Sequence, residues 1–388
     1  MKACILAVLA CASLALAQRS PVDQAWDLIA QGRRPEAIRL LDGFVKAHPG
    51  DADARLLLGS ALMEEGQRSE SIAQLTEAVR LRPDSAEAQN ALGEALNAFG
   101  ETKAARGPFQ KAVDLNPAFA PAQVNLGLVL LDLGEFSAAA PHLDRAIHLL
   151  GQSPDAAYPH YLRAKIYTQD GQVEPAAADL RKAVSLDPKF AEAWSDLGDA
   201  CKSLLDDAGA LAAFEKAVEF APQDPVAQTR LGLALLGEGK AQEALPHLEE
   251  AVRRDPENQS ALYALERALR AVGRQDEAEA VRKKLADLLH QKDQADQNTF
   301  RAIQLNDQGA ALEKTGKLRE ALAKYQQAVE LDPERVGIRV NYAAALLHTG
   351  QWNEGVAELR KVLELDPNNS AVKKALEEAL AHPPRGAQ

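Results

Sequence analysis

The histidine, cysteine and carboxylate side chains of this 388-residue chain do not combine into a catalytic or metal-binding pattern. The eight histidines are scattered, without an HExxH motif or another short-spaced pair that could hold a metal. Residues 232–240 resemble a phosphate-binding loop, but no Lys directly follows the second Gly and no strand is expected before it. The GxSxG, EF-hand and Rossmann motifs are absent from the sequence. We therefore predict no catalytic residues, no metal site, no cofactor and no enzymatic activity.

Two of the histidines, His142 and His247, each lie between a Pro and a Leu. The Pro in each case falls near the expected first turn of a helix, where a missing backbone N–H costs least. We interpret both histidines as structural.

The composition describes a soluble, folding chain, with 46% hydrophobic and 26% charged residues. Its formal net charge of −12 argues against binding to nucleic acids or anionic membranes, because both require a basic face. We expect no nucleic-acid partner.

The first 17 residues have the pattern of a secretory signal peptide. Lys2 precedes an uncharged run that ends in Ala15-Leu16-Ala17. We predict cleavage after Ala17 and an exported protein, periplasmic or secreted, with lipidation at Cys11 as the minor alternative. An uncleaved anchor is disfavoured, because the run is shorter than the roughly 20 residues that span a bilayer. No other segment is expected to cross a membrane.

Export would leave one cysteine in the mature chain. Cys4 and Cys11 would leave with the signal peptide, and Cys201 would remain. An intramolecular disulfide is then impossible, and we predict that Cys201 is a small buried apolar residue.

A repeat in the sequence predicts the helices that must position any functional side chain. Prolines recur every 34 residues, or at twice that period plus a small insertion, which indicates a stack of helical hairpins. These are Pro49, Pro83, Pro117, Pro188, Pro222, Pro256, Pro333 and Pro367.

Residues 191–222 show the repeat unit most clearly. It is similar to the tetratricopeptide repeat pattern W-x2-L-G-x2-Y, then A-x3-F, then P, except that a Cys replaces the Tyr. The matching residues are Trp194, Leu197, Gly198, Cys201, Ala210, Phe214, Ala217 and Pro222. The resemblance covers almost the whole chain after residue 17. It implies an all-α fold, a right-handed α-α superhelix of about ten helix-turn-helix repeats with a C-terminal capping helix.

Within each repeat, a small residue of the first helix (helix A) is expected to face a large apolar residue of the second helix (helix B), since a larger side chain would hold the backbones apart. The small residues are Ala25, Gly59, Gly93, Gly127, Ala164, Gly198, Gly232, Gly309 and Ala343. The large residues are Leu41, Leu75, Phe109, Leu143, Leu180, Phe214, Leu248, Tyr325 and Leu359.

The repeat is interrupted twice. Three extra residues, 151–153, follow the fourth repeat, and the eighth repeat is degenerate, with Glu266 and Arg282 at positions that elsewhere hold small or apolar residues. The segment 291–301 is polar, and it is predicted to be either a hinge that ends at Asn298 or Thr299 as an N-cap, or an exposed continuous helix. The predicted organisation is a signal peptide (1–17), repeats one to eight (18–290), the segment 291–301, repeats nine and ten (302–367), a capping helix (368–381) and a disordered tail (382–388).

The resemblance also implies a binding surface. In tetratricopeptide proteins the second, fifth, ninth and twelfth repeat positions of helix A line a concave groove that binds a protein or peptide. Carried onto this chain, these positions give Val124, Leu128 and Leu131, then Tyr158, Tyr161, Lys165 and Thr168, then Val226, Thr229, Leu233 and Leu236, and finally Tyr263, Arg267 and Arg270. The alternative is that superhelical curvature buries part of this surface against neighbouring repeats.

Some members of the family clamp a C-terminal carboxylate with Asn, Lys and Arg from three consecutive repeats. Asn125 and Asn341 match the middle Asn, but the flanking cations are missing. We therefore do not expect a clamp of this kind.

The predicted function is a non-catalytic scaffold that binds an extended peptide or partner protein, and the oligomeric state is left open. The alternative is a scaffold in envelope assembly, such as polysaccharide export, pilus or outer-membrane machinery. A carbohydrate-binding module that uses Trp26, Trp194 and Trp352 ranks below both. Trp194 is expected to be buried and Trp352 to pack at a turn, which leaves Trp26 for the groove.

Overall fold

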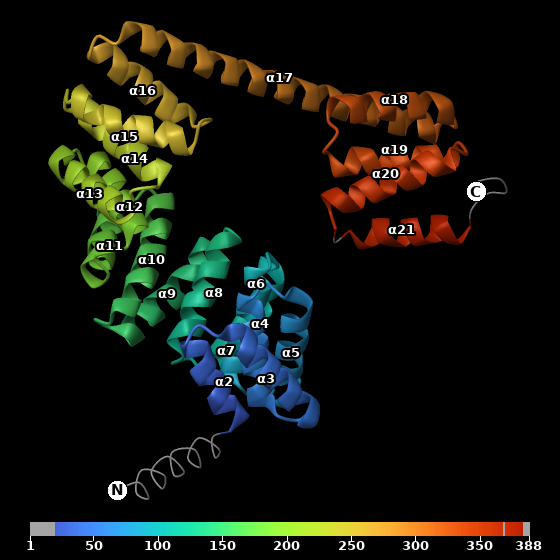
Figure 1. The fold of residues 1–388 in the computed structure, drawn as a ribbon, viewed down its shortest axis with the longest axis horizontal. Coiled ribbons are helices and arrows are strands. Elements are labelled where there is room, and N and C mark those ends of the chain that lie inside the picture. Colours follow the sequence, from blue (N-terminus) through green and yellow to red (C-terminus); the bar gives the residue numbers. More distant parts are fainter. Residues whose placement is uncertain (1–19, 368, 383–388) are drawn as a thin grey trace, which may run out of the picture. The chain divides into compact units, whose positions relative to one another are not determined.

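The structure is a computed structural model that describes residues 20–367 and 369–382. The predicted signal peptide, residue 368 and residues 383–388 lie outside the described residues. The described part consists of α-helices, one 3-10 helix and turns, and it contains no strand (Figure 1). The prediction of an all-α array of helical hairpins is confirmed.

Contacts divide the chain into two compact units, unit 1 (Met1–Asp255) and unit 2 (Pro256–Gln388). The division precedes the eighth repeat, whereas the sequence pattern placed the end of the first array at residue 290. The helices of unit 1 are α2 (Pro21–Ala30), α3 (Arg34–Ala47), α4 (Ala52–Glu64), α5 (Arg68–Leu81), α6 (Ala86–Ala98), α7 (Thr102–Leu115), α8 (Ala120–Asp132), α9 (Phe136–Leu150), η1 (Pro154–Ala156), α10 (Ala157–Gln169), α11 (Val173–Leu186), α12 (Ala191–Ser203), α13 (Asp207–Phe220), α14 (Pro225–Gly237) and α15 (Ala241–Arg254). The helices of unit 2 are α16 (Gln259–Ala271), α17 (Gln275–Lys314), α18 (Leu318–Leu331), α19 (Val336–His348), α20 (Trp352–Leu365) and α21 (Ser370–Ala381).

The turn between helix A and helix B requires a left-handed backbone. Nine repeats place a Gly there with positive φ, for example Gly171 at 71° and Gly239 at 75°. The sixth repeat instead has Leu205 with φ of 60°, and this side chain is 88% exposed. A non-glycine residue in this conformation is strained, so the sixth repeat forms the same turn at a higher conformational cost.

The two helices of a hairpin approach most closely where the small residue meets the large one. A Cβ atom added to Gly198 would lie 2.4 Å from the ring of Phe214, and one added to Gly93 would lie 2.7 Å from Phe109. The large residues are buried, Phe109, Phe214 and Tyr325 among them. The expected pairing of small and large residues thus forms the inside of each hairpin.

At the helix A position that Trp194 occupies in the sixth repeat, the side chain bonds to the backbone at the end of the preceding repeat. In five repeats this side chain donates to the carbonyl oxygen of the proline six residues earlier, at 2.8–3.1 Å. The pairs are Arg55 with Pro49, Gln123 with Pro117, Trp194 with Pro188, Gln228 with Pro222 and Arg339 with Pro333. Trp194 is half-buried rather than buried as expected, whereas Gln123 and Gln228 are buried at the same position.

Other single-residue predictions hold. Cys201 is a free, buried thiol, whose pKa is raised by burial. Trp352 packs at a turn and donates its indole N–H to the Ala379 carbonyl of α21 at 3.2 Å. Val372 of α21 is buried in a cluster with Leu359 and Val362, which agrees with a capping role for this helix.

Helix α17 runs without a break through 40 residues, so the segment 291–301 is helical and the hinge alternative is wrong. Thr299 does not cap a helix; its hydroxyl contacts Asp332 at 3.2 Å. Every residue from 289 to 297 is exposed. The middle of α17 is therefore a solvated helix between two packed ends.

Candidate functional site

The helix A surface of unit 1 brings the predicted residues of the fourth and fifth repeats together. Val124, Leu128 and Leu131 of α8 are half-buried, and with Tyr161 of α10 they pack against one core cluster that contains Leu126. Their remaining exposed area forms an apolar strip along α8. The prediction of an apolar, tyrosine-bearing surface thus corresponds to neighbouring residues here.

Three aromatic rings form a cluster at the start of α10 and α12. The ring centroids of Tyr158 and Tyr161 are 6.3 Å apart, and those of Tyr161 and Phe190 are 4.8 Å apart. Tyr158 is exposed and Tyr161 is half-buried. Burial raises the pKa of the Tyr161 hydroxyl, and the nearby Asp196 carboxylate raises it further. Phe190 was not among the predicted groove residues, because it precedes helix A and the groove positions lie within that helix. Phe119 holds the same position before α8, and this recurrence of an aromatic residue could have indicated it.

A pocket of about 330 Å³ opens beside this cluster, between α10, α11, α12 and α14. Lys165 joins the two features, because its Nζ lies 5.3 Å from the centroid of the Tyr161 ring and its side chain lines the pocket. The apolar lining residues are Ala164, Val173, Ala176, Leu180 and Ala200. The polar lining residues are Lys165, Thr168, Gln169, Asp196, Asp199, Ser203 and Arg230.

Arg230 of α14 organises the charges of this pocket. Its guanidinium pairs with Asp199 at 2.6 Å and Asp196 at 3.3 Å, and it donates to the Ser195 hydroxyl at 2.5 Å. The pKa of Asp199 is nevertheless raised, because burial and the Asp196 charge together outweigh the Arg230 guanidinium. Arg230, Asp196 and Asp199 were not among the predicted groove residues. Asp199 nevertheless holds the ninth position of helix A in the sixth repeat, which is one of the groove positions.

The predicted residues of α14 are only partly accessible. Val226 is exposed, and Leu233 and Leu236 are half-buried. Thr229 is 5% exposed, and its hydroxyl donates to the Pro225 carbonyl at 2.6 Å. Thr229 therefore does not line an open surface, and its assignment to the groove is corrected here.

The last three predicted residues lie on α16 in unit 2. Tyr263 and Arg267 are exposed, and the Arg267 guanidinium lies 5.8 Å from the centroid of the Tyr263 ring. Arg270 pairs with the buried Glu266 at 2.7 Å. These side chains form a small cationic and aromatic patch within unit 2.

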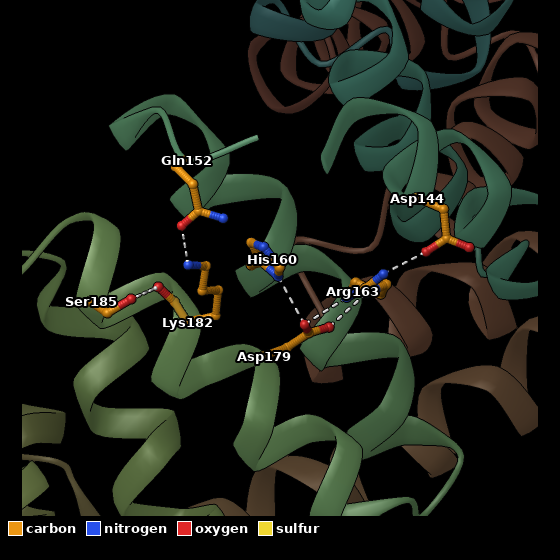
Figure 2. A network of polar contacts seen from close by, with 7 residues as sticks. All are labelled: Asp144, Gln152, His160, Arg163, Asp179, Lys182 and Ser185. Atoms are coloured by element: carbon orange, nitrogen blue, oxygen red, sulfur yellow. Dashed lines mark hydrogen bonds and ion pairs between the residues drawn. The ribbon is translucent and has the colours of Figure 1, made fainter. Parts of the chain in front are cut away.

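A buried polar network supports the hairpin that carries the tyrosines (Figure 2). Arg163 of α10 pairs with Asp179 of α11 through two hydrogen bonds of 2.6 and 2.7 Å, and with Asp144 of α9 at 2.7 Å. His160 Nδ1 lies 2.8 Å from the Asp179 carboxylate. Burial alone would raise the pKa of Asp179, but Arg163 and His160 hold it below its usual value.

The three-residue insertion contributes to the same region. Gln152 accepts a hydrogen bond from Lys182 of α11, so the lengthened loop contacts the hairpin that follows it (Figure 2). The bonds of Arg163 therefore tie α9, α10 and α11 together, and a separate bond attaches the inserted loop to α11.

The two asparagines considered for a carboxylate clamp bond to other repeats instead. Asn125 Nδ2 donates to Asn90 at 3.0 Å and to Glu94 at 2.9 Å, and Asn341 donates to Asn306 at 2.9 Å. These side chains link neighbouring A helices.

Neither a metal cluster nor a membrane span is found within the part of the chain that the structure describes. No group of three or more His, Cys, Asp or Glu side chains there could hold a metal ion. None of its helices combines the length and the apolar character needed to cross a bilayer.

Family models match most of the chain. Two models described as "Tetratricopeptide repeat" match residues 28–95 and 312–379 and residues 205–290, and a "TPR repeat" model matches 164–204. A curated relative, the "Heat-shock protein cognate (HSC) co-chaperone sgt12" of Aspergillus fumigatus, is 46% identical over 65 residues. That match covers 16% of this chain and 19% of the co-chaperone, so the two proteins share only a short segment.

Solved structures of other proteins are similar to this chain. The pilF protein of Pseudomonas aeruginosa is 18% identical with a TM-score of 0.50, over 54% of this chain and 94% of that one. A tetratricopeptide repeat protein of Parabacteroides merdae is 15% identical with a TM-score of 0.48, over 64% and 97% of the chains. At these identities the likeness concerns the fold alone.

Proposed function

The chain belongs to the tetratricopeptide repeat family, and from this premise we propose that it is a non-catalytic scaffold for a partner protein. The partner would lie as an extended segment along the helix A surface of α8, α10, α12 and α14. The fold itself is one that serves protein–protein interaction through an extended surface.

The observation that carries this proposal is the aromatic cluster with its adjoining pocket. Tyrosine is among the residues that dominate binding energy at protein interfaces, chiefly where it borders a pocket that excludes water. Tyr161 packs with the apolar strip of α8 and contacts Lys165, which lines the pocket, and Tyr158 lies beside Tyr161. A partner side chain would gain both burial and specific polar contacts there.

Cross-linking and pull-down with the purified full chain would test the groove. Tyr161→Ala and Leu128→Asp are expected to weaken capture of the same partner, since both side chains belong to the surface. Tyr167→Ala is the matched control, because Tyr167 lies on the same helix and contacts Arg163 instead of the cluster. Retention of every partner by both groove variants would show that the surface is assigned wrongly.

We propose further that the protein is exported from the cytoplasm. A scaffold in envelope assembly is the alternative to the general partner-binding scaffold. The proposed export rests on the pattern of residues 1–17. Cell fractionation followed by N-terminal sequencing is expected to find a mature chain that starts at Gln18. An intact N-terminus in the cytoplasm would contradict export, and a lipid-modified Cys11 would support the minor alternative.

The carbohydrate-binding alternative depends on Trp26 alone. Trp194 and Trp352 donate their indole N–H groups to backbone carbonyls, whereas Trp26 is exposed on α2. Quenching of Trp26 fluorescence by oligosaccharides would favour this alternative.

A further inference from the structure

The pocket beside Lys165 is lined by Val173, at a helix B position where the preceding repeat has the larger Phe136. Val173 begins α11 and lines the pocket. Phe136 holds the equivalent position at the start of α9, and there it packs against the core. The first residue of helix B is thus smaller in the fifth repeat than in the fourth.

The walls of this pocket differ in character. Ala164, Val173 and Leu180 provide an apolar floor, which suits the aliphatic stem of a long side chain. Asp196 and Asp199 provide two carboxylates at the rim. The Asp199 side chain is 49% exposed, so a ligand has access to it.

One guanidinium serves both carboxylates. Arg230 already contacts Asp196 and Asp199. Burial, and after it the Asp196 charge, raises the pKa of Asp199, and the charges of Arg230 and Lys202 do not offset this rise. A second cation near Asp199 would lower the electrostatic energy of this arrangement. An acidic ligand group would meet two carboxylates, with Lys165 as the remaining cation of the lining.

We propose that this pocket binds a basic side chain, Arg or Lys, of the partner segment. The charged end pairs with Asp199, and the aliphatic stem lies on the apolar floor next to the aromatic cluster. The net charge of −12 would also favour encounter with a basic partner. This inference rests on the proposed function, because it names the chemistry of the segment that the groove would bind.

The test uses a displayed library of random 12-residue peptides, selected against the full chain at low salt. Peptides that require Tyr161 are expected to be enriched in Arg or Lys at one position. Replacement of that residue by Gln in a selected peptide, or Asp199→Asn in the protein, should weaken binding roughly two- to fivefold, the upper part of the range for an exposed ion pair. Glu215→Gln, which removes one carboxylate on the exposed face of α13, is the matched control and should leave binding unchanged.

A second variant fills the pocket without removing charge. Val173→Phe introduces the side chain that the chain already accommodates at Phe136, so folding is expected to be preserved, which circular dichroism checks. This variant should also lose the preference for basic peptides.

The outcomes separate the two proposals. Selection of no peptide, or of peptides indifferent to Tyr161→Ala, would overturn the groove and this inference together. Tyr161-dependent peptides that lack a basic residue, favour acidic residues, or bind Asp199→Asn and Val173→Phe normally would overturn this inference alone.

Discussion

Gly198 and Phe214 illustrate how the sizes of two facing residues, one on helix A and one on helix B, are matched within a repeat. All three aromatic residues at the helix B position, Phe109, Phe214 and Tyr325, face a Gly within 3 Å of where its Cβ would lie. Where the helix A residue is Ala, as at Ala164, its partner is a Leu. The size of one side chain therefore limits the size of the other.

This rule predicts coupling between the two positions. Gly198→Ala should lower the free energy of unfolding by about 2 kcal/mol, because the added methyl overlaps the Phe214 ring. The double variant Gly198→Ala with Phe214→Leu restores the Ala–Leu pair, so its loss should be about 1 kcal/mol smaller than the sum of the two single losses. Urea unfolding of the four proteins measures this, and strict additivity would contradict the rule.

Leu205 offers a stabilising substitution. Leu205→Gly should raise the free energy of unfolding by about 0.5–1 kcal/mol, because relief of the left-handed strain exceeds the added entropy of the unfolded chain. Gly239→Leu, at the same turn of the next repeat, is the matched control and should destabilise by a similar amount. The urea midpoints are the measurement, and a destabilised Leu205→Gly would mean that the exposed Leu makes a contact of its own.

Asp179 should govern part of the acid stability. Its pKa in the folded state is lowered, so its contribution is present above the ordinary value of about 3.9 and is lost as the pH falls through the lower folded value. Asp179→Asn should cost about 3 kcal/mol at neutral pH, since it breaks a buried ion pair whose carboxylate is 8% exposed. The difference from the unmodified protein should shrink below pH 4.

The matched control is Asp144→Asn, which removes the other carboxylate on Arg163. Asp144 is 57% exposed, so the cost should be below about 1 kcal/mol. Urea midpoints measured from pH 2 to pH 7 test both variants. An equal cost for both would contradict the role of burial.

At the scale of the element, α17 decides between the two alternatives that the sequence left open, a hinge and a continuous exposed helix. The low apolar content of residues 290–299 favoured a hinge, yet the segment lacks Gly and Pro and contains three Gln, one Lys and one Ala. Ala, Gln and Lys are good helix formers, so the helix continues without packing. A side-chain bond from Gln297 to Asp293 at 2.8 Å, one turn apart, supports it.

A proline in this solvated stretch should act only locally. Ala295→Pro removes a helix bond and clashes with the preceding turn, at about 3 kcal/mol. Because residues 289–297 are all exposed, the thermal unfolding midpoint should stay unchanged while protease cleavage and amide exchange rise there. Ala183→Pro, in packed α11, is the control and should abolish cooperative folding; an equal effect of both would mean that the middle of α17 packs against something.

The repeat period predicted the helices and the tyrosines, but it did not predict the pocket. Tyr158 and Tyr161 follow from positions within a single repeat. The pocket needs Val173, Asp199 and Arg230 from three successive repeats, and the rotation between repeats that brings them together is not contained in the spacing. Burial of Thr229 was missed for the same reason.

At the scale of the whole molecule, the ninth repeat resembles the first repeat of an array, and we call this a second start. In the fourth repeat the helix A positions that face the preceding repeat are Ala122, Leu126 and Val129, all fully buried. In the ninth repeat they are Gln304, Gln308 and Ala311, all exposed. The first repeat also has polar residues there: Ser20 and Asp27 are exposed, and Gln24 is half-buried. The ninth repeat thus has the polar outer face of a terminal repeat.

We predict that residues 298–382 fold as an isolated monomer, because this fragment starts on a polar face and ends on the capping helix α21. The matched control is residues 120–204, which also comprise five helices but expose the apolar face of α8. Size-exclusion chromatography and thermal unfolding should show a cooperative monomer for the first and association for the second. Association of both would contradict a second start.

The solvated middle of α17 also bears on how binding energy spreads through the chain. In stacked repeats, stability is shared because each repeat contributes an interface term with its neighbour, much as in a one-dimensional Ising chain. Residues 289–297 are all exposed, so the coupling that runs through this stretch is the continuity of its helical hydrogen bonds. A partner that binds to unit 1 stabilises its folded repeats. It should therefore leave the unfolding temperature of repeats nine and ten unchanged.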